Sequence, residues 1–401
     1  MHQKDIRFEH IKVKDLHEFA ERVLGSSRKG QFVPITMQRA IAHANNPYAA
    51  KNDVCLLVAI DDADDADDAD EVVGYFGILP LLLRNGDEYF KANWFTTWSV
   101  SSKVRGRGVG AQLMAEALSL NQDYLIVGSV HARRVCRKYG FWERQPLSYY
   151  WLDTTGMGHL NPLVWLQRGY RKLLHLLRIK KVVKLKNPLI DRIDGWVGPV
   201  LKRFFYALIS GPQTKVLAGI RFEEVDQISG EPPTQPHRPQ TELHRGVDAV
   251  NWMLKYPWVV ETGQSITEEM DYFFSDARPI YRLIALEVFS PEDEYKGFVV
   301  FSASQKGNKF MLKTLDYCFA NPSDRRYVLA LAVHFGREYL ADTIEIPEEA
   351  AVNLRPRLLG KLLLHKKERI YQCMPKDEDS PLAQAWEDIT LKLVDGDMAF
   401  S

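Results

Sequence analysis

Glycines and arginines alternate in one short stretch of the chain, Arg105-Gly-Arg-Gly-Val-Gly110. Glycine allows sharp backbone turns and lets amide N–H groups come close to a ligand. The apolar run 94–100 precedes the stretch and the amphipathic run 111–120 follows it, as a strand and a helix would. The first amides of a helix lack intrahelical acceptors and carry the positive end of its dipole. The stretch therefore predicts an anion cradle suited to a pyrophosphate, with a purely structural turn as the alternative.

Two common phosphate-binding patterns do not fit this stretch. No Lys-Ser or Lys-Thr pair follows the last glycine, as a Walker loop requires. Gly106, Gly108 and Gly110 alternate, whereas dinucleotide-binding folds use the spacing G-x-G-x-x-G. The cradle must therefore belong to another class of phosphate site or be structural.

A second pattern downstream narrows the choice. It reads Ala132-x-x-x-Cys136-x-Lys138-x-Gly140-Phe141, one helix and one strand after Arg105-x-x-Gly108-x-Gly110. The two motifs together resemble those of the GNAT superfamily of acyl-CoA-dependent N-acyltransferases, and the similarity covers residues 4–155. That superfamily usually has tyrosine where this chain has Cys136. The resemblance implies that the glycine stretch binds the pyrophosphate of CoA.

The order of expected elements in the first half agrees with that resemblance. Apolar runs and alternation predict strands, and amphipathic patterns predict helices. We expect strands over 6–13, 53–60, 71–83, 89–100, 124–130 and 148–153, and helices over 15–24, 36–44, 111–120 and 132–139. Asn85-Gly86 predicts a hairpin turn between two of these strands.

The second half repeats the same order of elements. We expect strands over 220–225, 280–289, 297–304, 310–318, 343–346 and 369–374, and helices over 247–256, 324–340 and 350–358. The stretch that corresponds to the cradle, 319–324, has no glycine and contains Pro322, which lacks an amide donor. We therefore expect a second GNAT-like domain that does not bind CoA in the usual way.

The predicted fold class is α/β, with a mixed, mostly antiparallel sheet flanked by helices, present in two tandem copies. The expected divisions are a CoA-binding domain over 1–155, a basic helical linker over 156–212 and a degenerate second domain over 213–401. The 401 residues, 46% of them hydrophobic, are enough for such domains.

Charge and composition indicate a cytoplasmic protein that does not bind nucleic acid. The formal net charge is zero, so nothing steers the whole chain toward nucleic acid. The N-terminus is charged from the start, and the longest apolar run, 72–83, is too short to cross a bilayer. The four cysteines are scattered, which argues against a disulfide framework, and no metal site is expected.

The segment 159–203 departs from this neutral balance. It holds 11 Lys and Arg against two acids, Asp191 and Asp194, and interleaves them with leucines and aromatic residues. We interpret it as a basic amphipathic helical linker packed between domains. The alternative is a helix that makes peripheral contact with a membrane surface.

The resemblance also implies which residues bind the cosubstrate, acetyl-CoA. The amides of the cradle hold the pyrophosphate, the two arginines add charge, and the preceding strand pairs with the pantetheine arm through its backbone. These cofactor-binding residues are Trp98, Ser99, Val100, Arg105, Gly106, Arg107, Gly108, Val109, Gly110 and Ala111.

The candidate catalytic residues depart from the family pattern. Cys136 replaces the usual tyrosine acid, and the alternative is a small buried residue. His131 is the first candidate for the base or acid, with a structural histidine as the alternative, and Tyr139 lies nearly one helical turn after Cys136. The run 94–99 before the cradle contains no carboxylate, although relatives often have an acidic base there.

These observations predict an N-acetyltransferase that acts on the primary amine of a small molecule by direct attack. The runs 73–80 and 98–100 and the closing Trp386…Asp395-Gly-Asp397 are similar to bacterial two-domain members linked to polysaccharide biosynthesis, which implies an amino sugar. The alternatives are a peptide or lipid-linked amine, or an acyl-CoA-binding protein without catalysis.

Overall fold

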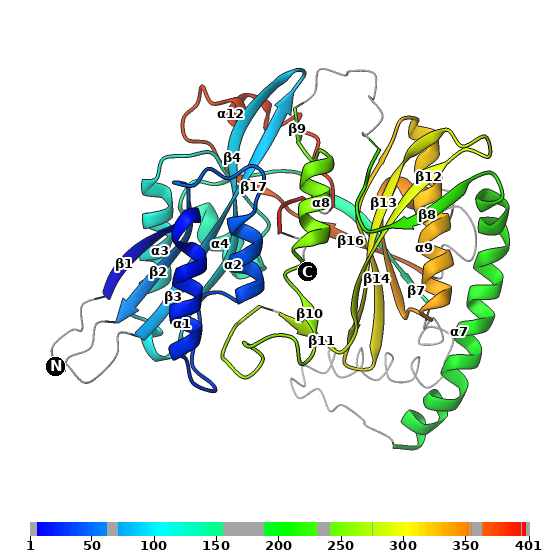
Figure 1. Cartoon of the computed structure of the whole chain (residues 1–401), viewed down its shortest axis with the longest axis horizontal. Coiled ribbons are helices and arrows are strands. Elements are labelled where there is room, and N and C mark those ends of the chain that lie inside the picture. The colour runs from blue at the N-terminus through cyan, green and yellow to red at the C-terminus, as the bar shows by residue number, and fades with distance from the viewer. Residues whose placement is uncertain are drawn as a thin grey trace, which may run out of the picture.

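Two mixed β-sheets, one mainly from each half of the chain, make up most of the protein. The computed structural model describes residues 6–61, 71–154, 188–230, 241–274, 276–352, 354, 363–393 and 395–397. Figure 1 shows the two sheets side by side with helices packed around them. This architecture confirms the predicted fold class, two mixed α/β units in tandem.

The first sheet begins with the predicted antiparallel meander β1–β2–β3–β4, and β5 pairs with β4 in parallel. The bounds are β1 Ile6–Lys12, β2 Val54–Asp61, β3 Glu71–Asn85, β4 Glu88–Val100 and β5 Tyr124–Ile126. The predicted hairpin is present, since β3 ends at Asn85 and Gly86 takes a φ of 61° in the turn.

Helices cover both faces of this sheet because successive strand residues point to opposite sides. On one face α1 and α2 pack over Tyr75, and on the other α3 and α4 pack over Phe76. The bounds are α1 Leu16–Ser26, α2 Met37–Ala44, α3 Val109–Ser119 and α4 Val130–Lys138. A hydroxyl caps α2, where Thr36 Oγ1 accepts a hydrogen bond from the Arg39 amide.

The second sheet has the same plan. Its meander is β8–β12–β13–β14, and β15 pairs with β14 in parallel. The strands are β8 Arg221–Val225, β12 Tyr281–Phe289, β13 Tyr295–Lys306, β14 Lys309–Phe319 and β15 Thr343–Pro347, and the helices are α8 Val247–Lys255, α9 Arg326–Glu338 and α10 Glu348–Ala351. The smaller elements are β9 Glu242–Leu243, β10 Val260–Glu261, β11 Ala277–Arg278, α12 Pro381–Ala385 and the 3-10 turns η1 Val13–Asp15, η2 Ser102–Val104 and η3 Pro322–Arg325.

The two halves exchange a strand. β7 (Leu147–Asp153), from the first half, lies between β15 and β16 (Leu364–Arg369) in the second sheet. β17 (Gln372–Met374), from the second half, lies between β5 and β6 (Trp142–Glu143) in the first sheet. Each sheet therefore depends on the other half for its backbone hydrogen bonds.

This exchange corrects two sequence predictions. The strand predicted over 148–153 is present, but it completes the second sheet rather than the first. The single strand predicted over 369–374 is wrong, because β16 and β17 lie in different sheets. Apolar patterns identify strands without identifying their partners. We propose the boundaries 1–155, 156–212 and 213–401 as divisions of the chain, not of the sheets.

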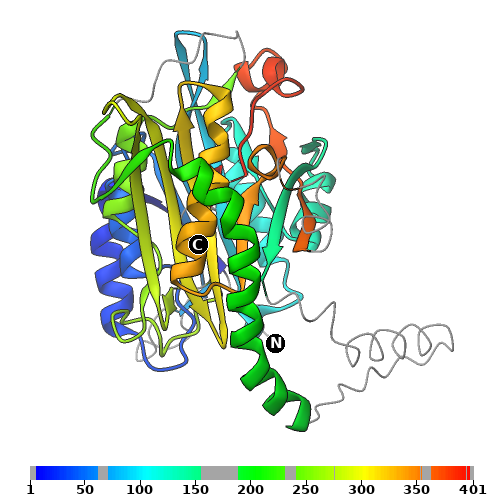
Figure 2. The ribbon, with the colours of Figure 1, turned by 90° about the vertical axis from the view of Figure 1, so that its right-hand side faces the viewer.

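Part of the predicted linker forms the long helix α7 (Pro188–Leu217), while residues 155–187 lie outside the described part of the chain. α7 runs beside α9 along the outer side of the second sheet (Figure 2) and buries Phe205, Tyr206 and Ile209 in the core there. None of the described helices is both long enough and apolar enough to cross a bilayer. The membrane contact suggested for 159–203 stays a prediction.

An apolar cluster joins the two sheets. Trp94 and Leu125 of the first sheet share it with Phe298 and Val300 of the second, and Trp386 closes it. The face of the first sheet opposite α3 is thus buried partly under α1 and α2 and partly against the other half. Residues from both halves meet along β4.

Candidate functional site

The alternating glycines form an open turn at the start of α3. Gly106 and Gly108 have φ angles of 86° and 80°, which residues with side chains rarely adopt. A Cβ at either position would meet no atom of the described residues within 4 Å, so that part of the chain leaves the space beside the turn open. The Gln112 amide makes the first helical bond, to the Gly108 carbonyl. The amides of residues 109–111 precede it and have no acceptor within the helix, as an anion cradle requires.

The two cradle arginines differ in their surroundings. Arg105 is exposed. Arg107 Nη1 lies 3.2 Å from Asp61 Oδ2 at the end of β2, so part of its charge is already neutralised. Of the two, Arg105 is the better placed to add charge to an anion in the turn.

The strands on either side of the cradle diverge. β4 and β5 pair only from Asn93 to Phe95, and β5 stops at Ile126, earlier than the predicted end at 130. The chain leaves the sheet there because Ser129 caps α4, its hydroxyl accepting the Ala132 amide at 3.3 Å. Residues 96–100 of β4 therefore have no partner on the β5 side within the described chain.

The predicted pantetheine-binding residues lie on this open edge. Trp98, Ser99 and Val100 are half-buried at the end of β4. A Cβ on Gly110 would lie 3.4 Å from Val100 Cγ2, so the first turn of α3 packs directly on them. The cradle and the open edge thus form one continuous surface. The binding roles of these residues stay predictions.

A bulge interrupts β4 at the point of divergence. Phe76 pairs with Trp98 and Ile78 with Phe95, so Thr96 and Thr97 together face Gly77 alone. A Cβ on Gly77 would lie 2.6 Å from Thr97 Oγ1, which only glycine avoids. The bulge lies where the open edge begins.

A carboxylate that β4 itself lacks reaches this bulge from the end of the chain. Thr96 Oγ1 donates a 2.7 Å hydrogen bond to Asp397 Oδ2. The preceding residue, Gly396, has a φ of 79°, and a Cβ on it would lie 1.9 Å from Trp94 Cε2. The segment can lie flat against β4 only because of this glycine. Asp397 is half-buried beside the bulge, where its carboxylate can accept a proton.

Sequence reasoning missed Asp397 as a site residue. The Asp395-Gly-Asp397 pattern indicates only a family likeness, because nothing in it predicts contact with a strand some 300 residues earlier. The usable signal was a glycine between two acids near the end of the chain, a place where close backbone packing and charge coincide.

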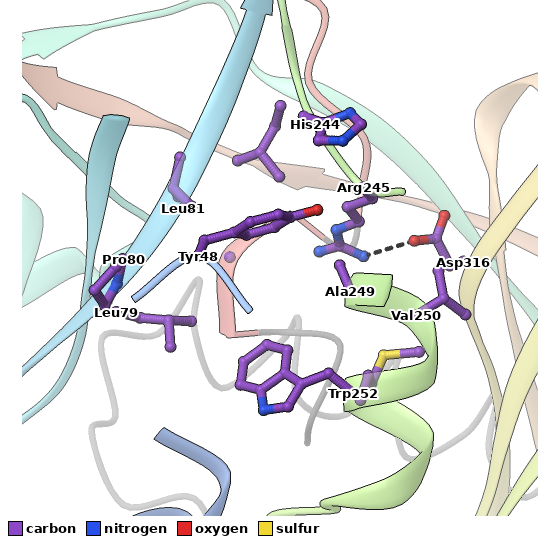
Figure 3. A pocket seen from close by; sticks show the side chains of 13 residues that line it. Tyr48, Leu79, Pro80, Leu81, His244, Arg245, Ala249, Val250, Trp252 and Asp316 are labelled. Carbon is purple, nitrogen blue, oxygen red and sulfur yellow. Dashed lines mark hydrogen bonds and ion pairs between the residues drawn. The ribbon is translucent and has the colours of Figure 1, made fainter. Parts of the chain in front are cut away.

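Buried ion pairs hold this C-terminal segment in place. Figure 3 marks the ion pair between Arg245 and Asp316. Arg245 Nη1 lies 3.1 Å from Asp316 Oδ2, and Arg245 Nε lies 3.6 Å from Asp395 Oδ1. Lys392 Nζ lies 3.5 Å from Asp316 Oδ1. Two cations balance two carboxylates, which is the condition for burying such charges.

The two carboxyls of this network differ in acidity. Burial raises the pKa of Asp395 to about 6, although Arg245 and Lys392 favour its charged form. Burial also opposes ionisation of Asp316, but Lys392 and Arg245 together hold its pKa below its ordinary value. Asp316 is therefore the permanent anion of the network.

A cavity of about 50 Å³ lies between the halves beside this network. Tyr48 and Pro80 line it from the first half, and Arg245, Trp252 and Asp316 from the second (Figure 3). The Tyr48 hydroxyl accepts a hydrogen bond from the Gly246 amide at 3.4 Å.

The three predicted catalytic residues occupy different environments. His131 is exposed in the first turn of α4. Cys136 is fully buried beneath Phe141, and burial raises its pKa to about 11. Tyr139 ends the same helix, and its hydroxyl donates a 3.0 Å hydrogen bond to the Ala111 carbonyl. Only Tyr139 makes a hydrogen bond to the cradle, and all three catalytic roles stay predictions.

The corresponding junction of the second half is closed. Asn321 Oδ1 accepts the Ser323 amide at 2.9 Å, and Pro322 has no amide to offer. Arg325, the N-cap of α9, has a φ of −55°, so no left-handed turn opens the backbone there. This arrangement fits the expectation that the second half lacks a usual CoA loop.

Comparisons with known proteins identify structural similarity only. No protein-family model and no curated protein matches the chain. The chain is similar to a GCN5-related N-acetyltransferase from Anabaena variabilis, with 12% identity, 92% of this chain and 73% of that one covered, and a TM-score of 0.42. It is similar to N-myristoyltransferase of Saccharomyces cerevisiae with bound myristoyl-CoA, with 9% identity, coverage of 92% and 82%, and a TM-score of 0.44. It is also similar to a GCN5-related N-acetyltransferase from Kribbella flavida, with 14% identity, coverage of 92% and 70%, and a TM-score of 0.41.

Proposed function

We propose that this protein is an acyl-CoA-dependent N-acyltransferase that transfers the acetyl group of acetyl-CoA to a primary amine of a small molecule. The observation that carries this proposal is a surface along β4 and the start of α3, to which the C-terminal segment adds a carboxylate. It joins the open amides at the start of α3, the unpaired edge of β4 and the carboxylate of Asp397. The sequence motifs of the cradle and of α4 add independent support.

Each part of this surface has a role in the proposed reaction. The amides of residues 109–111 hold the pyrophosphate, and the free backbone of residues 96–100 pairs with the pantetheine arm. A backbone amide of the same edge polarises the thioester carbonyl. Trp94, Thr96 and Gly396 pack closely at the base of the divergence, which favours a short acyl group.

Asp397 and Tyr139 are the proposed proton carriers. Asp397 takes a proton from the acceptor ammonium, and the freed amine forms a C–N bond to the thioester carbon. The C–S bond breaks, and Tyr139 gives its hydroxyl proton to the leaving thiolate. The second proton that the nitrogen loses as the amide forms restores the Tyr139 hydroxyl through solvent. We choose Tyr139 over Cys136 and His131 because its hydroxyl reaches the first turn of α3.

The sequence supports a class of acceptor and a cellular compartment for this reaction. Likeness to polysaccharide-linked proteins suggests an amino sugar as the acceptor. The four cysteines are all free thiols, which supports a reducing compartment such as the cytoplasm.

Calorimetric titration with CoA and a thiol-release assay test the proposal together. We expect saturable CoA binding, and acetyl-CoA turnover that depends on an added amine from a panel of amino sugars, amino acids and polyamines. Tight CoA binding without turnover for any amine would contradict the catalytic function and leave a CoA-binding protein. Absence of CoA binding would contradict the cradle itself.

A further inference from the structure

A buried arginine lies where the two halves meet. Arg39, on α2, is only 4% exposed. Its guanidinium carbon lies 4.4 Å from the centre of the Trp258 ring and 5.7 Å from those of Tyr272 and Phe274. The arginine comes from the first half and the three rings from the second. This aromatic cage therefore exists only when the halves are packed together.

The cage leaves the edge of the guanidinium unsatisfied. Arg39 Nε and Nη1 are buried without a hydrogen-bond partner, and no carboxylate of the described residues lies within ion-pair distance. Ring faces attract a cation with about 2 kcal/mol, but they accept none of its N–H groups in the guanidinium plane. Burying an unpaired charge costs far more than that. The missing acceptor is therefore expected from a ligand.

Two further polar groups lie around Arg39 without partners. His43 Nδ1 and the Tyr272 hydroxyl are buried and make no hydrogen bond. Burial, aided by the charge of Arg39, lowers the pKa of His43 to about 3, so this ring is neutral near neutral pH. Burial raises the pKa of Tyr272 to about 12, so its hydroxyl keeps its proton. The cage thus offers one positive charge and neutral hydrogen-bonding groups.

The cage adjoins the divergence of β4 and β5. Tyr75 stacks on Tyr272 with ring centres 5.9 Å apart, and Tyr75 pairs in register with Ser99 on the open edge of β4. Asp397, which is bonded to Thr96, lies close enough to Tyr272 to disfavour its ionisation. The proposed base and the buried arginine therefore lie near the same tyrosine ring.

We propose that Arg39 binds a carboxylate of the acceptor, so that the acceptor is a primary amine that also carries a carboxylate group. The guanidinium edge holds the carboxylate at one end while the amine faces Asp397 at the other. A planar guanidinium donates two parallel hydrogen bonds to a carboxylate. The single positive charge matches one carboxylate better than a dianionic phosphate. This inference rests on the proposed acyltransferase function and names its substrate class.

Matched pairs of acceptors test the substrate class on the unmodified protein. The pairs are β-alanine with β-alaninamide, and 2-amino-2-deoxyglucuronic acid with glucosamine, each with acetyl-CoA in the thiol-release assay. We expect kcat/KM for the acid to exceed that for its neutral partner by about 100-fold in at least one pair. Equal or better turnover of the neutral partners would overturn the inference while leaving the acyltransferase function intact. Preference for glucosamine 6-phosphate over both acids would overturn the carboxylate assignment.

Substitution of Arg39 tests the residue. Arg39→Met should lower kcat/KM for the acid about 100-fold and change that for the neutral amine less than about threefold, with CoA affinity unchanged. The matched control is Arg22→Met, because Arg22 lies over the Phe19 ring at 5.6 Å but is exposed. An unchanged ratio of acid to neutral turnover in Arg39→Met would overturn the assignment.

A binding measurement separates failure of this inference from failure of the proposed function. If no amine is acetylated, calorimetric titration of the CoA-saturated protein with the two acids decides the matter. Binding that disappears in Arg39→Met supports the carboxylate site without any catalysis. Absence of binding by both acids overturns it.

Discussion

The two halves share a strand order but differ at the junction between the fourth strand and the next helix. Read from one edge, β1–β2–β3–β4–β5–β17–β6 corresponds to β8–β12–β13–β14–β15–β7–β16. Both fourth strands carry a bulge just before the junction, at Thr96–Thr97 in β4 and near Leu315 in β14. The sheets alone therefore do not distinguish the halves.

The junctions between the fourth strand and the next helix do distinguish the two halves. In the first half Gly108 takes a left-handed conformation and leaves the next amides without acceptors. In the second half Asn321 and Pro322 remove the corresponding donors. A few residues thus decide whether this fold presents an anion site, which is why similarity of fold does not establish function.

The second half contributes something else to the same site. It supplies Arg245 and Asp316, which anchor the C-terminal segment, and Trp258 and Tyr272, which surround Arg39. The comparison suggests that the first half binds the cosubstrate while the second half shapes the acceptor side. Substitutions in each half test that division.

The largest effect is expected from Gly108→Asp. A carboxylate in the cradle repels the pyrophosphate and competes for its amides, so CoA affinity should fall at least about 1,000-fold, or about 4 kcal/mol, in calorimetry. Gly86→Asp is the matched control for backbone strain, because Gly86 has a φ of 61° and no atom near its Cβ position. Ser323→Asp, at the closed junction, should leave affinity unchanged. Retained affinity in Gly108→Asp would refute the cradle.

Asp397→Asn should act on the chemical step instead. The amide still accepts the Thr96 hydrogen bond but takes no proton, so kcat should fall by about 10²–10⁴-fold with CoA affinity unchanged. Asp388→Asn, an exposed acid near the same end of the chain, is the control. Unchanged kcat in Asp397→Asn would mean that another group is the base.

Asp397 also shows where sequence reading stops. Most of the strands and helices, the hairpin at Asn85-Gly86 and the glycine turn were predictable, because each depends on neighbours in sequence. The exchange of β7 and β17 was not predictable, because an apolar pattern predicts a strand but does not specify which sheet the strand joins. The sequence did not predict the contact of Asp397 with Thr96 or the cage around Arg39, for the same reason. Each brings together residues that are far apart in the chain.

Arg245→Met should destabilise the fold rather than the chemistry. It leaves Asp316 and Asp395 buried beside a single remaining cation, Lys392, and breaking such a pair costs about 3–5 kcal/mol. Urea unfolding measures this loss. Arg39→Met is the matched comparison, because Arg39 has no acid partner among the described residues and its removal should cost little or even stabilise. Equal destabilisation by both substitutions would contradict the distinction between a structural and a ligand-binding arginine.

The same network predicts a smaller effect of pH on stability. The folded pKa of Asp395, about 6, lies above its ordinary value of 3.8, so the folded state holds this proton more tightly than the unfolded state. The contribution of Asp395 to stability should therefore be present below about pH 4 and be lost as pH rises through about 6. Asp395→Asn should flatten the free energy of unfolding over that window in urea titrations. An identical slope in both proteins would contradict the assignment.

The smallest effect is expected from Cys136→Ala. This substitution tests whether the catalytic groups of the first half include this residue of α4. The thiol is fully buried and its pKa is raised to about 11, so a core role predicts kcat within about twofold of the unmodified protein and a stability loss of about 1 kcal/mol. Tyr139→Phe on the same helix should lower kcat more, because it removes the hydroxyl bonded to the Ala111 carbonyl. A drop of about 100-fold in Cys136→Ala, with Tyr139→Phe unaffected, would reverse the choice of proton donor. The cysteine at the usual tyrosine position would then be a functional replacement rather than a core residue.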